Sequence, residues 1–125
     1  MKLEIVLARL AVEHWKLLRS FERTVDFAPF DAKTRLSAQA RYAASRLEML
    51  LQDANMKIVS FDGVAFEVNL PAIAINGEDF VGLDNLVVEQ TIEPAVVSDM
   101  TVLQMGKVLL ERSPKSGSHQ DVSGH

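Results

Sequence analysis

The side chains of this sequence that could take part in catalysis or metal binding are three histidines and a group of carboxylates, because the chain contains no Cys. The absence of Cys excludes thiol catalysis, Cys-ligated zinc, iron–sulfur clusters and disulfides. His119 and His125 fall in a Ser/Gly-rich terminal stretch, where they are either simply solvated or adventitious metal ligands. His14 is the one remaining histidine, so nucleophile–base arrangements lack their parts.

The carboxylates concentrate in the second half of the chain, as Glu67, Glu78, Asp79, Asp84, Glu89, Glu93 and Asp99. Two paired carboxylates can hydrolyse a glycosidic bond, and Glu78-Asp79 directly after an Asn-Gly pair could contact a cation. Their spacing matches no calcium loop, and the sequence has no Gly-rich phosphate loop. We interpret them as a solvated acidic face and expect no catalytic residue, metal or cofactor, hence not an enzyme. A small hydrolase using these carboxylates is the weaker alternative.

The elements that would position these residues begin with a helix over residues 2–26. One stripe follows alternating three- and four-residue steps, the spacing of a coiled-coil seam, and consists of Leu3, Leu7, Leu10, His14, Leu17, Phe21 and Thr24. A second stripe on another side contains Ile5, Ala8, Val12 and Trp15. A helix this broadly apolar needs cover on more than one side. We therefore expect a homo-oligomer, a dimer first, whose interface contains Leu3, Leu7, Leu10, Val12, His14, Trp15, Leu17 and Phe21.

A second helix is expected after Pro29, with Phe27 and Phe30 as loop anchors and Asp31 as the N-cap. Its buried face should comprise Leu36, Ala40, Ala43, Leu47, either Leu50 or Leu51, and Ala54. We expect the helix to end at Asn55, because Asn tolerates left-handed backbone geometry. The connection of about four residues predicts an antiparallel helical hairpin.

A flanking stripe on the second helix is formed by Arg35, Tyr42, Arg46 and Met49. Arg and Tyr are enriched in interface hot spots, although their stems also cover core edges. We predict a partner-contacting surface that contains Arg35, Tyr42 and Arg46, together with Glu89 and Glu93 from the acidic half. His14, on the seam of the first helix, is expected to fix partner geometry rather than to catalyse.

From Lys57 onward the hydrophobic period changes from 3.6 to 2. The stretch IVSF-DG-VAFEV predicts a β-hairpin, because Asp62-Gly63 suits a type I′ turn that sets Phe61 opposite Val64. A less regular stretch at 71–85 precedes a β-branched one at 86–97, where Pro94 implies an edge or a bulge. A last strand is expected at about 102–111, with Gly106 as a possible bulge.

These elements predict an α+β fold in three parts: a helical hairpin at 1–56, a small and mainly antiparallel β module at 57–112, and a disordered tail at 113–125. The length of 125 residues and the 48% hydrophobic content suit one domain, or an arm with one module. Residues 1–57 contain ten Lys+Arg and seven Asp+Glu, whereas residues 58–125 contain three and ten. The arm is thus mildly basic and the module acidic.

The net charge of −4 argues against nucleic-acid binding as the main activity. No window reaches the roughly 18 consecutive apolar residues of a membrane span, so we expect no membrane association. The N-terminal stretch lacks the features of a targeting signal. A cytoplasmic location is therefore expected.

Two stretches of the chain resemble the GrpE family, the nucleotide exchange factors of DnaK-type chaperones. The first is LEMLLQDANMKIVSFDGVAF at 47–66, which is similar to the family's passage from its last short helix into a strand and a glycine turn. The second is VVEQTIEPAVVSDMTVLQMGKVLLE at 87–111, where Val87-Val88-Glu89, Asp99, Val102-Leu103 and Val108 match the family's ending. The family's long N-terminal coiled coil is missing or reduced to the first helix.

The resemblance implies a dimer through the helices and a β module that presses against a chaperone ATPase domain. Nucleotide exchange would follow because binding stabilises an open nucleotide cleft, which is a population shift without covalent chemistry. The sequence thus predicts a non-catalytic protein-interaction module. The alternative is a self-associating adaptor or assembly subunit unrelated to chaperones.

Overall fold

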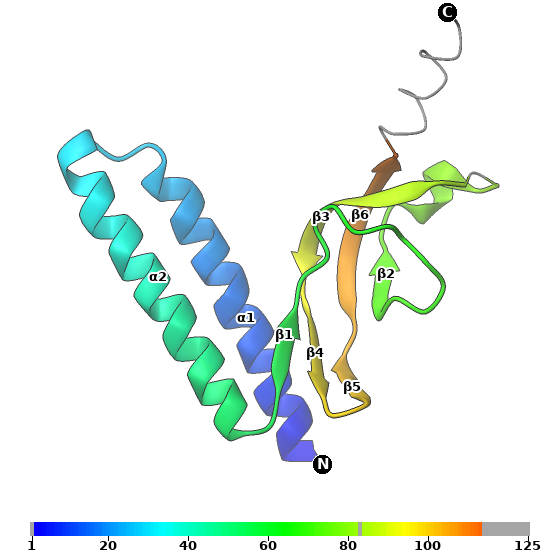
Figure 1. Cartoon of the computed structure of the whole chain (residues 1–125), viewed down its shortest axis with the longest axis horizontal. Helices are drawn as coiled ribbons and strands as arrows, with labels where there is room; N and C mark the ends of the chain where they lie inside the picture. The colour runs from blue at the N-terminus through cyan, green and yellow to red at the C-terminus, as the bar shows by residue number, and fades with distance from the viewer. Residues whose placement is uncertain (1, 83, 114–125) are drawn as a thin grey trace, which may run out of the picture.

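The computed structural model describes residues 2–82 and 84–113. The chain begins with two antiparallel helices, α1 (Lys2–Val25) and α2 (Phe30–Asp53), joined by residues 26–29 (Figure 1). The predicted helical hairpin is therefore confirmed. The predicted tail at 113–125 lies outside the described residues apart from Ser113.

The sequence predicted the C-terminal end of α2 correctly but not its N-terminal end. Asn55 takes the expected left-handed conformation, with φ of 61°, and Ala54 is the C-cap. At the other end the N-cap is Pro29, which supplies no side-chain cap, so the expectation for Asp31 was wrong; Asp31 lies within the first turn. Phe27 and Phe30 are not loop anchors either, because they are 89% and 88% exposed.

The rest of the chain forms two small sheets. Their strands are β1 (Lys57–Val59), β2 (Ala72–Ala74), β3 (Leu86–Glu93), β4 (Ala95–Ser98), β5 (Thr101–Gln104) and β6 (Gly106–Arg112), and the 3₁₀ helix η1 (Gly77–Phe80) follows β2. One sheet has the order β1-β4-β5 and is antiparallel. The other has the order β2-β6-β3, in which only β2 is parallel to its neighbour. The α+β fold with a mainly antiparallel module is confirmed.

The two sheets share a single bent strand pair. β3 continues into β4 through Pro94, and β5 continues into β6 through Met105, and both halves pair antiparallel around the turn at Asp99. Pro94 interrupts the ladder because it has no N–H to donate. Pro94, expected at an edge or a bulge, instead separates β3 from β4, and the single strand expected at about 102–111 is divided into β5 and β6.

The β-hairpin predicted around Asp62-Gly63 does not form. The turn exists, because Val64 N–H donates to the Phe61 carbonyl, but Gly63 alone has a positive φ, and a type I′ turn needs two such residues. After the turn the chain does not return along β1. Val64 and Phe66 instead exchange backbone hydrogen bonds with β3, through Val88 and Leu86. The long strand β3–β4 thus takes both β1 and the stretch after the turn as neighbours.

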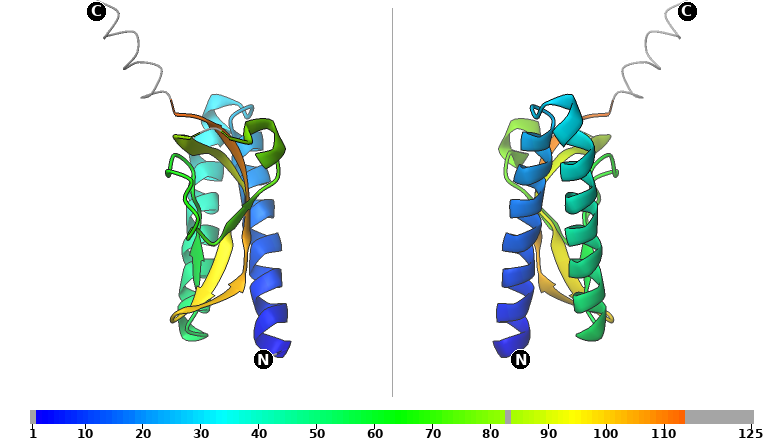
Figure 2. Two further views of the ribbon diagram at one scale, coloured as in Figure 1. Left: turned by 90° about the vertical axis from the view of Figure 1, so that its right-hand side faces the viewer. Right: turned by 90° about the vertical axis from the view of Figure 1, so that its left-hand side faces the viewer.

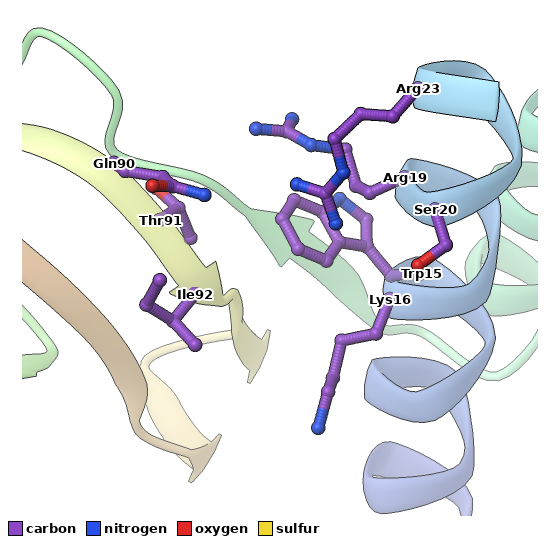
Figure 3. Close-up of a pocket in the computed structure, with 8 residues that line it drawn as sticks. All are labelled: Trp15, Lys16, Arg19, Ser20, Arg23, Gln90, Thr91 and Ile92. Atoms are coloured by element: carbon purple, nitrogen blue, oxygen red, sulfur yellow. The ribbon is translucent and has the colours of Figure 1, made fainter. Parts of the chain in front are cut away.

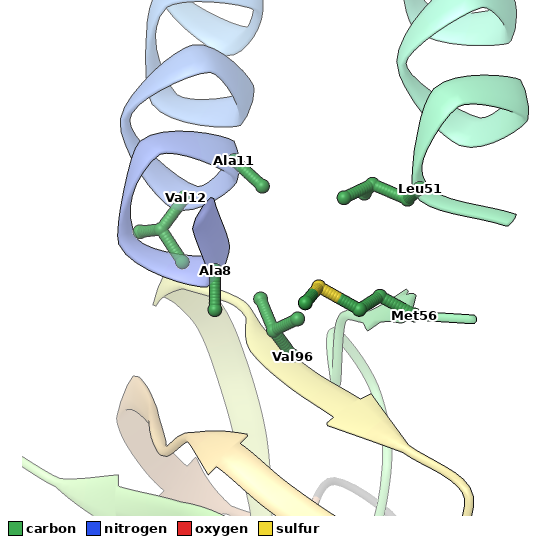
Figure 4. Close-up of a cluster of buried hydrophobic side chains, with 6 residues drawn as sticks. All are labelled: Ala8, Ala11, Val12, Leu51, Met56 and Val96. Carbon is green, nitrogen blue, oxygen red and sulfur yellow. The ribbon is translucent and has the colours of Figure 1, made fainter. Parts of the chain in front are cut away.

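The hairpin stands alongside the strands, with α1 against β3, β4 and β5, and with the end of α2 against β1 (Figures 1 and 2). The cluster that joins hairpin and module consists of Ala8, Ala11, Val12, Leu51, Met56 and Val96. Figure 4 shows Leu51 and Met56 pointing from the α2 side toward α1 and Val96. A second cluster, between the strands, consists of Phe61, Ala72, Val88, Ala95, Val108 and Leu110.

Candidate interaction surface

The helical hairpin carries an apolar groove of about 420 Å³ between its two helices. α1 contributes Leu7, Leu10, Ala11 and His14, and α2 contributes Tyr42, Ala43, Arg46, Leu47, Leu50 and Leu51. We call this surface the hairpin groove. It arises from helical periodicity, because residues three, four and seven apart on each helix share one face.

The lining of the hairpin groove combines buried residues with large exposed ones. Ala11 and Leu51 are buried, whereas Leu10, Leu50 and Tyr42 are 63%, 56% and 69% exposed. The exposed apolar stripe continues along α1 in both directions, through Leu3 and Leu17. Exposed apolar surface of this kind is typical of interaction sites.

The polar groups of the hairpin groove are cationic or neutral. His14 and Arg46 line it, together with Tyr42, and no carboxylate of the described ranges does. Among the described residues, no carboxylate lies within ion-pair distance of Arg46. Its guanidinium is therefore available to a partner at the edge of the groove.

The structure brings together residues that the sequence assigned to two separate interfaces. Leu7, Leu10 and His14, expected to mediate self-association, line the same groove as Tyr42 and Arg46, expected to contact a partner. The remaining members of these sets lie elsewhere. Leu3, Leu17 and Arg35 are exposed outside the groove, Trp15 and Phe21 are half-buried, and Val12 is 3% exposed within the core. Val12 is thus unavailable to a partner while the fold is intact.

Glu89 and Glu93, both on β3, lie away from the hairpin groove. Glu89 is exposed on the module. Glu93 is engaged within the chain, because Lys16 Nζ donates to its Oε2 at 2.8 Å and Lys107 Nζ lies 3.7 Å from its Oε1. Of the two, Glu89 alone keeps its carboxylate free of ion pairs in the part of the chain that the structure describes.

A second, smaller hollow of about 190 Å³ lies where α1 faces β3, and we call it the α1–β3 cleft (Figure 3). Its lining residues are Trp15, Lys16, Arg19, Ser20 and Arg23 from α1, and Gln90, Thr91 and Ile92 from β3. The sequence analysis missed this site. The sequence feature that could have indicated it is the spacing of Lys16, Arg19 and Arg23, which places three cations on one face of a helix.

Two ion pairs hold α1 against the module beside this cleft. Lys16 binds Glu93, and Arg19 Nη2 lies 3.1 Å from Asp62 Oδ2. The carboxylate of Asp62 also accepts a hydrogen bond from Thr91 N–H at 2.7 Å. The Arg19 guanidinium stacks over the Trp15 ring, with Cζ 4.6 Å from the ring centroid.

These contacts shift the pKa values of three side chains, those of Asp62, Glu93 and Lys16. Burial raises the pKa of Asp62, but hydrogen bonds from Thr91 and Arg19 outweigh it and bring the pKa below its ordinary value. The hydrogen bond from Lys16 lowers the pKa of Glu93, and the same bond raises the pKa of Lys16. Both carboxylates are therefore stabilised in their charged forms, Glu93 by Lys16 of α1, and Asp62 by Thr91 of the module together with Arg19 of α1.

The remaining chemistry-bearing residues are scattered. Glu78 and Asp79 are exposed on η1, and within the described ranges no group of three or more His, Asp or Glu side chains is placed to hold a metal ion. His119 and His125 lie outside those ranges. Neither described helix combines the length and the apolar run that crossing a membrane requires.

No protein-family model matches the chain, and no curated protein and no solved structure matches it either.

Proposed function

We propose that the protein is a non-catalytic interaction module that self-associates through the outer face of its helical hairpin, a dimer being the first choice. The observation that carries this proposal is the hairpin groove, with Leu3, Leu10, Leu17 and Leu50 left exposed along and beside it. The proposal includes a cytoplasmic location, which the absence of Cys permits.

Burying the exposed leucines of the hairpin against a second subunit is energetically favourable. Burying one leucine side chain contributes about 1.5–3 kcal/mol, so several leucines together are a substantial driving force. In a two-fold dimer the same patch occurs on both subunits, and Leu10 and Leu50 of one hairpin would enter the groove of the other. In the part of the chain that the structure describes, the groove lining contains no carboxylate that this packing would bury.

The test is the mass of the protein in solution across a range of concentrations, by analytical ultracentrifugation. We expect the mass to rise toward twice that of the chain, and Leu10→Asp to remain monomeric. Because Leu10 is 63% exposed, this variant should keep its helical circular dichroism. Met100→Asp, at a position 98% exposed in the β4–β5 turn, is the matched control and should associate like the wild type. A wild-type protein that stays monomeric at every concentration would refute the proposal.

A second candidate function is nucleotide exchange on a DnaK-type chaperone, as the resemblance to the GrpE family implies. It is favoured by the order of a helical arm followed by a β module that exposes Glu89 on β3. The assay is the release rate of labelled nucleotide from a DnaK-type ATPase domain, with Glu89→Gln compared against Glu67→Gln, which is also exposed. We expect acceleration that Glu89→Gln weakens; no acceleration would reject this candidate and leave the self-association proposal standing.

A further inference from the structure

The cationic side chains that line the α1–β3 cleft have no part in the self-association proposed above. We propose that it is an anion site that binds a phosphoryl group between the guanidinium groups of Arg19 and Arg23. The ligand class is a tetrahedral oxyanion, either free or carried on a small molecule.

The charge of the cleft supports an anionic ligand. Lys16, Arg19 and Arg23 line it, and among the described residues no carboxylate does. Lys16 and Arg19 are partly neutralised by Glu93 and Asp62. Arg23 has no carboxylate within ion-pair distance in the described part of the chain. An uncompensated cation therefore remains in a hollow on an otherwise acidic protein.

The hydrogen-bond donors are in excess as well. A guanidinium carries five N–H donors in a planar fork that matches phosphate oxygens. The ion pair with Asp62 occupies the Nη2 of Arg19, which leaves donors on its other nitrogens. Ser20 and Gln90 add a hydroxyl and an amide to the lining (Figure 3). Paired guanidinium groups hold phosphate by charge-assisted hydrogen bonds.

The arrangement is preorganised around one of the two guanidinium groups. Stacking over Trp15 and the bond to Asp62 fix Arg19 from two sides. Arg23 lies one helical turn further on, at the i,i+4 distance where like charges repel. A bound dianion would relieve this repulsion. The volume of about 190 Å³ is below the range of drug-sized pockets, so a single phosphoryl group is the fitting occupant.

Trp15 makes the site directly observable, because it is the single tryptophan of the chain and lies in the cleft lining. We would titrate the full-length protein with inorganic phosphate and with phosphoserine while following tryptophan fluorescence. Chloride added to the same ionic strength is the reference for non-specific screening. We expect a saturable fluorescence change with at least one of the two phosphoryl ligands. Tighter binding of inorganic phosphate would indicate that the natural ligand is a free anion. Tighter binding of phosphoserine would indicate a phosphoryl group carried on a larger molecule.

The decisive variant is Arg23→Gln, which removes no ion pair among the described contacts and should therefore leave the fold intact. We expect it to weaken phosphoryl binding by about tenfold or more, the usual effect of losing a charged hydrogen-bond partner. Arg35→Gln, an exposed arginine on α2 outside the cleft, is the matched control and should bind like the wild type. Fluorescence changes no larger than those with chloride, or undiminished binding by Arg23→Gln, would overturn the proposal.

Discussion

At Gly106 the two halves of the bent strand pair approach so closely that a side chain has no room. A Cβ atom there would lie 2.9 Å from Phe61 Cε2, 3.0 Å from the Glu93 carbonyl oxygen and 3.2 Å from Ala95 N. Two of these neighbours are backbone atoms on either side of Pro94, and they cannot move without disturbing the strand. The glycine therefore follows from the bend.

Gly106→Ala should lower the free energy of unfolding by roughly 1–3 kcal/mol, because the added methyl group overpacks a closed site. Urea denaturation measures this loss. Gly77→Ala is the control, since its Cβ would meet only Ala74 Cβ, at an ordinary 3.5 Å. If both variants lost the same unfolding free energy, the close approach at Gly106 would not be the reason that a side chain is unfavourable there.

The ion pair between Lys16 and Glu93 predicts a dependence of stability on pH. Because the folded pKa of Glu93 lies below its ordinary value of 4.5, the contribution is present at neutral pH and is lost as the pH falls through that lowered pKa. Asp62 acts in the same direction below its ordinary value of 3.8. The raised pKa of Lys16 keeps the cation charged throughout, and its contribution is lost only above 10.5.

Glu93→Gln should therefore reduce the difference in unfolding free energy between about pH 6 and about pH 3. The reduction should be about 1 kcal/mol at most, because the Lys16 side chain is 36% exposed and solvent screens the pair. Urea unfolding at both pH values gives the comparison. Glu89 lies on the same strand but has no ion pair in the described contacts. Glu89→Gln should therefore change the difference in unfolding free energy between the two pH values by less. A Glu93→Gln profile identical to that of the wild type would contradict the assignment.

At the scale of elements, the sequence predicted the helices better than the strands. A helix is defined by local periodicity, and on the expected inner stripe of α2 Ala40 is buried, while Leu36 and Leu47 are half-buried. Local periodicity did not decide which stripe of α1 would be buried. The strands pack against the stripe that contains Ala8 and Val12, whose small side chains allow close approach, and leave the leucine seam exposed.

The β-hairpin around Asp62-Gly63 failed for a non-local reason. The turn forms, but the stretch after it pairs with the longer strand β3, whose paired residues lie 20 to 24 positions further along the chain. Competition between a nearby strand and a distant one depends on the tertiary arrangement, which alternation of residue types does not encode. The α1–β3 cleft was missed for the same reason, since β3 supplies one of its walls.

Adjacent leucines at the end of α2 test which face of the helix is packed. Leu51 is 4% exposed and Leu50 is 56% exposed. Leu51→Ala should therefore reduce the free energy of unfolding by about 2–5 kcal/mol through loss of burial and creation of a cavity. Leu50→Ala should change the stability of the monomer by much less, and thermal or urea denaturation of both variants gives the difference. A larger loss for Leu50→Ala would mean that this face is covered by another subunit.

At the scale of the whole molecule, the helical hairpin and the β module share one core cluster. Ala8 and Val12 of α1 and Leu51 of α2 pack with Met56 and Val96, which belong to the module side. The ion pairs of Lys16 and Arg19 lie across the same boundary. The mildly basic arm and the acidic module are thus joined by apolar packing and by charge.

Val96→Ala should therefore destabilise both parts together. Val96 is fully buried where α1 meets β4, and its truncation should cost roughly 2 kcal/mol. Far-ultraviolet circular dichroism follows the helices, and amide hydrogen exchange follows the strands, through the same urea transition. We expect the two midpoints to shift equally. A hairpin that keeps its wild-type midpoint while the strands lose theirs would show that the parts unfold independently.

The central position of β6 has a consequence for how the protein is made. Sheet β2-β6-β3 has its last strand in the middle, so neither outer strand can pair with β6 until the ribosome has passed Arg112, and β3 has only the short stretch after the turn beside it. β1 likewise waits for β4, whereas the two helices are complete at Asp53. For an interval on the order of seconds, the nascent hairpin therefore presents the side that contains Ala8, Val12 and Leu51 without Val96 of β4, which packs against it in the folded protein. Exposed apolar surface of this kind favours aggregation, so the newborn chain is expected to be most prone to aggregate before β4 has been synthesised.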